Sequence, residues 1–216
     1  MNVVRTALFG VSLLAAGCWG NEVTSFPEGL EPLGENDLPG PGTAADPYPE
    51  EYQLVGTSGG RFDRILGRGY IHAPIAQVWA AYRNPAVGAD RRTSPEWTSE
   101  PVEDHPYDDS YVVYHVAHEI VTVEWWVTWR HGLVSGTQES PELVSIRWQK
   151  TNGSTLISVI EGSLLLRPVT PTITEVELVY HASAAGAGTD TYVRYMNDVF
   201  NDAVAVVHDR PLPTFD

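Results

Sequence analysis

Two histidines and a glutamate stand close together in the run His115-Val116-Ala117-His118-Glu119, and such residues can bind a metal ion or move a proton. Histidines three residues apart would share one face of a helix. The neighbouring residues alternate as in a β-strand, where positions three apart face opposite sides of the sheet. We therefore expect no metal site. His118 could polarise a ligand carbonyl or act as a base, and the alternative is a half-buried, hydrogen-bonded histidine.

Other signatures of catalysis are missing from the sequence. It contains no glycine-rich phosphate loop and no Gly-x-Ser-x-Gly nucleophile elbow. Glu161 and Arg167 share a strand face but lie too far apart to pair. We assign no catalytic residue and expect no cofactor. An enzyme of the cyclase, dehydratase or hydrolase type, using His118 or Glu161, stays open as the alternative to a binding protein.

The chain is acidic, with 28 Asp and Glu against 13 Lys and Arg in 216 residues and a formal net charge of −15. Nucleic-acid binding needs a basic face, so this balance argues against it. A hydrophobic content of 43% is enough for one sizeable domain. Cys18 is the single cysteine, which excludes an intramolecular disulfide and a cysteine-based metal cluster.

Residues 189–208 form the clearest predicted element. Tyr192, Met196, Val199 and Phe200 recur at the three-and-four spacing of an amphipathic helix, which would be roughly 30 Å long. Before it come a strand at residues 67–73, a helix at 74–83 and strands at 110–119, 121–130, 143–150, 156–167 and 173–182. Gly162 is expected to mark a bulge that bends the sheet. This order predicts an α+β fold with helices on one side of an antiparallel sheet.

Bulky side chains recur on faces that we predict to point inward. They suit either a packed core, as in a protein-interaction module, or an apolar pocket with a few polar groups. The candidate ligand-binding residues on these faces are Trp79, Tyr82, Tyr114, His118, Trp125, Trp129, Trp148, Tyr180, Met196 and Phe200.

Two stretches resemble a known superfamily. Residues 70–79 (Tyr-Ile-His-Ala-Pro-Ile-Ala-Gln-Val-Trp), followed by Asn84-Pro85, are similar to the opening of the START and polyketide-cyclase-like (SRPBCC) proteins, and residues 161–166 resemble a late strand of that family. The resemblance implies the helix-grip fold, a bent antiparallel sheet around a long C-terminal helix. It also implies a cavity between them, which in many members binds lipids, sterols or polyketides. The family shares no catalytic residue set, so none is carried over.

The first eighteen residues have the pattern of a bacterial lipoprotein signal peptide. Arg5 precedes an apolar run that is too short for a transmembrane span, and the run ends in Leu14-Ala-Ala-Gly-Cys18. This ending resembles a lipobox, in which the cysteine receives lipid, although Ala15 stands where leucine is commonest. We expect lipidation of Cys18. An aspartate directly after the cysteine would resemble an inner-membrane retention signal of enteric bacteria. Trp19 stands there instead, which favours the outer membrane of the bacterial envelope.

Residues 19–51 are rich in proline, glycine and acidic side chains and lack lysine, arginine and apolar periodicity. This composition predicts a disordered tether between the lipid anchor and a folded domain at residues 52–216. The sequence thus predicts a membrane-tethered carrier of an apolar small molecule or lipid, held in a cavity under the C-terminal helix.

Overall fold

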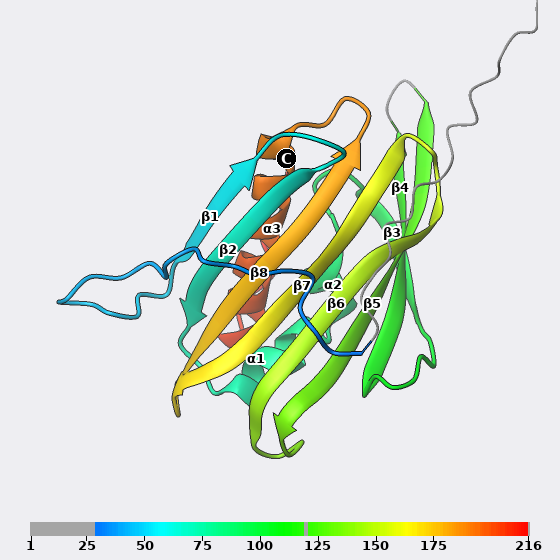
Figure 1. Cartoon of the computed structure of the whole chain (residues 1–216). Helices are drawn as coiled ribbons and strands as arrows, with labels where there is room; N and C mark the ends of the chain where they lie inside the picture. Colours follow the sequence, from blue (N-terminus) through cyan, green and yellow to red (C-terminus); the bar gives the residue numbers. More distant parts are fainter. Residues whose placement is uncertain (1–28, 119–120, 216) are drawn as a thin grey trace, which may run out of the picture.

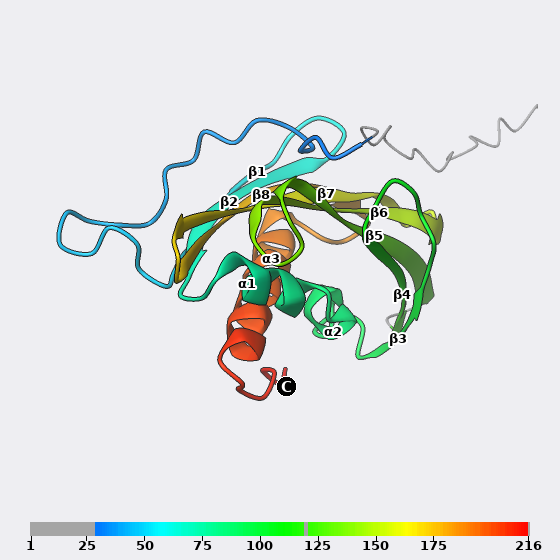
Figure 2. The ribbon, with the colours of Figure 1, turned by 90° about the horizontal axis from the view of Figure 1, so that it is seen from below.

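The computed structural model describes residues 29–118 and 121–215. Eight strands form one antiparallel sheet in the order β1-β2-β8-β7-β6-β5-β4-β3, and three helices lie against one side of it (Figures 1 and 2). The helices are α1 (Ile75–Tyr82), α2 (Pro85–Gly88) and α3 (Thr189–Val207). The strands are β1 (Tyr52–Thr57), β2 (Asp63–Ile71), β3 (Glu96–Pro101), β4 (Asp109–His118), β5 (Thr122–Gly136), β6 (Pro141–Gly153), β7 (Ile157–Thr170) and β8 (Ile173–Ala184).

The connections between the strands define the topology of the fold. Strands β3 to β8 follow one another as a meander, and β8 then pairs with β2, so that the first and last parts of the sheet lie side by side. Helices α1 and α2 come between β2 and β3, and α3 follows β8. The sheet bends around α3 (Figure 2). The predicted α+β class and helix-grip fold are confirmed.

Helix α3 is held by its apolar stripe. Tyr192, Met196, Val199, Phe200 and Ala203 are all buried, as the three-and-four spacing predicts. Phe200 stacks on the Tyr52 ring of β1, with centroids 4.3 Å apart and planes 6° apart. Strand β1 was not predicted from the sequence, and this contact shows how it helps to hold the helix.

The centre of the sheet is filled by stacked aromatic rings. Trp129 of β5 and Trp148 of β6 lie opposite each other and stack with centroids 4.5 Å apart. A Cβ atom at Gly162 of β7 would lie only 2.2 Å from the Trp148 indole. The register shifts between β7 and β8 lie at 157–159 and 168–170, away from Gly162. The expected bulge at Gly162 is therefore wrong: this glycine makes room for the Trp148 ring.

Residues 29–51, which we call the strap, run across the side of the sheet opposite the helices (Figure 2). The Asn36 side-chain amide donates to the carbonyl oxygens of Gly67 and Leu178, each at 2.9 Å. The Leu33 N–H donates to the Ser163 hydroxyl at 2.9 Å. These hydrogen bonds hold residues 33–36 of the strap against the sheet, although the composition of residues 19–51 predicts a disordered tether.

The predicted signal peptide, the lipidation of Cys18 and the rest of the predicted tether lie outside the described residues. Within residues 29–118 and 121–215, no helix is both long enough and apolar enough to cross a membrane.

Candidate functional site

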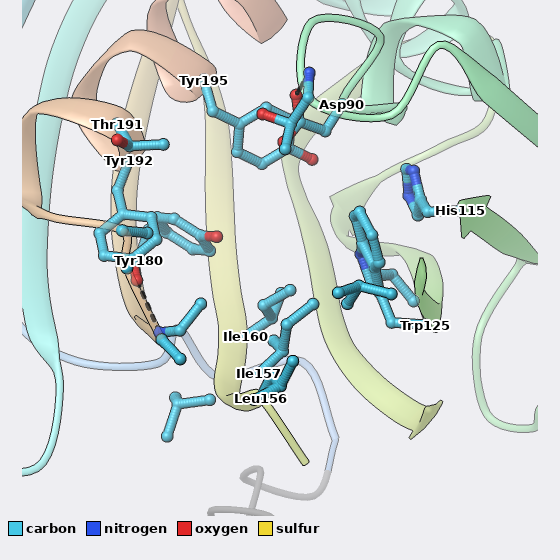
Figure 3. A pocket seen from close by; sticks show the side chains of 18 of the residues that line it. Asp90, His115, Trp125, Leu156, Ile157, Ile160, Tyr180, Thr191, Tyr192 and Tyr195 are labelled. Atoms are coloured by element: carbon cyan, nitrogen blue, oxygen red, sulfur yellow. Dashed lines mark hydrogen bonds between the residues drawn. The ribbon is translucent and has the colours of Figure 1, made fainter. Parts of the chain in front are cut away.

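A cavity of about 540 Å³ lies between the sheet and the first half of α3 (Figure 3). Strands β4, β5, β7 and β8 form its floor and sides, and the loops at 89–94 and 185–188 form part of its rim. Its lining side chains are mainly apolar. They include Asp90, Thr93, His115, Trp125, Val127, Ile157, Val159, Ile160, Tyr180, Tyr192 and Tyr195.

The apolar walls follow from strand alternation. Trp125 and Val127 are two residues apart on β5 and point to the same side of the sheet. Val159 and Ile160 are neighbours on β7, yet both line the cavity. The register shift between Ile157 and Val159 accompanies this departure from alternation. The irregular start of β7 thus adds apolar surface to the cavity.

His115 lies on the inner side of β4, beside Trp125. The two rings stack with centroids 4.8 Å apart and planes 9° apart. The side chain is 1% exposed, and burial lowers the pKa of the imidazole to about 3, so the ring is neutral at physiological pH. Its Nδ1 has no hydrogen-bond partner among the described residues. His115 therefore adds a neutral aromatic ring with one unpartnered nitrogen, Nδ1, to the cavity wall.

Asp90 brings a carboxyl group to the cavity from the loop after α2. Its Oδ1 accepts a hydrogen bond from the Thr93 N–H at 3.0 Å. Burial raises the pKa of the Asp90 carboxyl, although the hydrogen bonds from Thr93 act in the opposite direction. Figure 3 shows Asp90 at the same end of the cavity as Tyr195, away from Leu156 and Ile157.

Three tyrosines, Tyr180, Tyr192 and Tyr195, also line the cavity. The Tyr195 hydroxyl donates to the Gly88 carbonyl at 2.7 Å, and the Tyr192 hydroxyl accepts from the Ala184 N–H at 2.7 Å. Burial, with smaller contributions from a neighbouring tyrosine and the Asp90 carboxylate, raises the pKa of Tyr180 and Tyr195. These hydroxyls therefore stay protonated over the physiological range.

The predicted ligand-binding residues divide into three groups. Trp125 and Tyr180 line the cavity. Six others are buried in the core and do not line it, because neighbouring rings and helices fill the space around them: Trp79, Tyr82, Trp129, Trp148, Met196 and Phe200.

The remaining two, Tyr114 and His118, are on the wrong side of the sheet. Tyr114 is half-buried and packs against Trp126, with ring centroids 4.6 Å apart. His118 is exposed, and its Nε2 lies 3.4 Å from a carboxylate oxygen of Glu96. His115 takes the place expected for His118. The histidines do face opposite sides of β4, as strand geometry predicts.

Sequence reasoning missed Asp90, His115 and Tyr195 as cavity residues. Tyr195 follows Tyr192 by three residues on α3, so helix periodicity could have found it. Asp90 lies between the predicted helix at 74–83 and the predicted strand at 110–119, and no sequence pattern there marks the residue. Within the described part of the chain, no group of three or more His, Cys, Asp or Glu side chains could hold a metal ion.

Comparison with known proteins gives structural matches only. No family model and no curated protein sequence matches this chain. A STAR-related lipid transfer protein from Xanthomonas axonopodis is 13% identical with a TM-score of 0.49, over 74% of this chain and 93% of that one. The lipid transfer and protein localization domain of human StarD13 is 10% identical with a TM-score of 0.47, over 75% of this chain and 85% of that one.

The Zhui aromatase/cyclase from a Streptomyces species is 14% identical with a TM-score of 0.41, over 74% of this chain and 93% of the other. At such low identities and TM-scores, these matches do not show what this chain binds.

Proposed function

We propose that this protein binds an apolar small molecule or lipid in the cavity between the sheet and α3 and acts as its carrier. The observation that carries this proposal is the cavity itself. Its volume of about 540 Å³ is in the range of small-molecule sites, roughly 300–1,000 Å³. Its lining also has the expected composition, mostly apolar walls with a few polar groups. A core filled by side chains would leave no such space.

The binding test uses the neutral fluorescent probe N-phenyl-1-naphthylamine, whose emission rises in an apolar site. We expect saturable binding by the full-length Cys18→Ser protein. Ile160→Trp should abolish the binding, because the larger side chain takes up cavity volume. Val134→Trp adds the same ring at an exposed position of β5, 42% exposed, and should bind like the parent. Absence of binding by the parent, or equal binding by Ile160→Trp, would reject the carrier function.

We also propose that Cys18 is lipidated and holds the domain at the bacterial envelope, on the outer membrane. The support is the similarity of residues 14–18 to a lipobox. Only residues 19–28 separate Cys18 from the strap, and a chain of that length spans at most about 36 Å. A lipid anchor at Cys18 would therefore keep the domain close to the membrane.

The anchor is tested by fractionating cells that express the wild type or Cys18→Ser. The wild type should sediment with membranes and leave them only in detergent. The variant should be found in the soluble fraction, because the acyl chains supply the membrane affinity. A variant that stays with the membranes would reject the anchor and leave the cavity proposal intact.

A further inference from the structure

The charged side chains that line the cavity are of one sign. Among the described residues that line it, Asp90 is the only acidic side chain, and none is a lysine or arginine. His115 is neutral because burial lowers its pKa to about 3. The whole chain carries a formal net charge of −15, which attracts cations and repels anions. The cavity lining therefore offers one carboxyl group and no positively charged side chain.

The two arginines next to Asp90 are bound elsewhere. The Arg91 guanidinium contacts both carboxylate oxygens of Asp202 on α3, at 2.6 and 2.7 Å. The Arg92 guanidinium contacts both oxygens of Asp198 on α3, at 2.8 and 3.0 Å. These pairs hold the loop against α3, and no ion pair joins Asp90 to another described residue. Besides the larger effect of burial, the Asp198 charge raises the pKa of the Asp90 carboxyl and the Arg92 charge lowers it, so the two neighbours act in opposite directions.

Aromatic side chains line the same cavity as Asp90. Tyr180 and Tyr195 are close enough to Asp90 for its charge to affect their ionisation, and His115 stacks on Trp125 along the neighbouring wall. A cation beside a carboxylate and aromatic rings is stabilised by ion pairing and by the negative faces of the rings. An anion in the same place would be repelled by the Asp90 carboxylate, which is unfavourable.

We propose that the ligand of this cavity is an apolar amine, whose ammonium group pairs with Asp90 while its hydrocarbon part lies against β5 and β7. This inference rests on the proposed carrier function and makes it more specific. Asp90 then determines selectivity for the charge of the ligand head group, and the apolar wall accepts hydrocarbon of varied shape. The Asp90 carboxyl is half-buried and accepts a hydrogen bond from Thr93, and an ammonium group beside it would stabilise its carboxylate form further.

The test measures displacement of N-phenyl-1-naphthylamine by three ligands that differ only in the head group: dodecylamine, dodecanol and dodecanoate. We expect dodecylamine to displace the probe at a concentration at least about tenfold lower than dodecanol does, because the charged hydrogen bond adds to the apolar contacts. Dodecanoate should be the weakest of the three. The concentrations stay below those at which the ligands form micelles.

Asp90→Asn removes the charge and keeps the oxygen that accepts the Thr93 N–H. It should bring dodecylamine to the level of dodecanol and leave dodecanol unchanged, which also reports that the variant is folded. Asp190→Asn, at an exposed position in the first turn of α3, removes the same charge from a residue that does not line the cavity and is the matched control. It should retain the preference for the amine.

Two results would overturn the proposal while the carrier function stands. One is equal or better competition by dodecanol or dodecanoate in the wild type. The other is an amine preference that survives in Asp90→Asn. If the wild type binds neither the probe nor the amine, the carrier function is wrong and the amine proposal is wrong with it.

Discussion

On β4, a shift of one position along the strand changes the side of the sheet that a side chain faces. Tyr114 and Val116 alternate with Val113 and His115, so each side of the strand offers apolar residues. Alternation predicts that His115 and His118 face opposite sides, and this is confirmed. It does not tell which side is inward, because that depends on the sheet curving toward α3. The sequence therefore predicted a histidine in the cavity but named His118 in place of His115.

A second inner histidine, His131 on β5, gives a prediction about acid stability. It is 0% exposed, and both ring nitrogens lack a hydrogen-bond partner among the described residues. Burial, with a smaller contribution from Arg83, lowers the pKa of His131 to about 3. Below the usual value of 6.5 the unfolded chain binds a proton that the folded chain does not. Folding stability is therefore lost as the pH falls from 6.5 toward 3.

His131→Leu removes this proton uptake and replaces an unpartnered polar ring by an apolar side chain of similar size. Between pH 7 and pH 5 the wild type should lose about 2 kcal/mol of unfolding free energy through His131 alone, and the variant should keep it. Urea unfolding at both pH values measures the difference, with the exposed His118→Leu as control. A variant with the pH slope of the wild type would contradict the prediction.

The elements of the fold were predicted more completely than the site. Helix α3 and strands β4 to β8 follow from apolar periodicity, which the buried residues of each element report directly. Strand β1 was missed because it lies at the edge of the sheet and is only partly buried, so its residues show no alternation. The cavity could not be predicted, because the same aromatic residues fill a core or line a pocket according to the distance between sheet and helix.

Phe200 on α3 tests the separation between core and cavity. It is buried against Tyr52 and does not line the cavity. Phe200→Ala should therefore lower the unfolding free energy by about 3–5 kcal/mol through lost contacts and a new void. The affinity of the folded protein for N-phenyl-1-naphthylamine should be unchanged. Chemical unfolding and probe titration measure both effects, and an affinity loss without destabilisation would place Phe200 in the binding site.

At the scale of the whole molecule, the strap changes where the folded unit begins. Ser163 and Val179 are each 1% exposed on the side of the sheet that the strap crosses. Leu33 donates its N–H to Ser163, and Gly34 lies next to Val179. At the other end of the strap, Glu50 contacts His208, just after α3, at 2.8 Å. The strap therefore connects the outer side of the sheet with the end of the helix on its inner side.

Two truncated chains test this boundary, one starting at residue 29 and one at residue 52. The longer chain keeps the strap and should unfold at the same urea concentration as the full-length Cys18→Ser protein. The shorter chain leaves the Gly67 and Leu178 carbonyls without the Asn36 donor and exposes the outer side of the sheet. It should lose about 2 kcal/mol or more. The opposite result would be equal stability of the two chains, together with rapid proteolysis within residues 29–51 of the longer one. It would show that the strap belongs to a disordered tether and that the domain starts at residue 52.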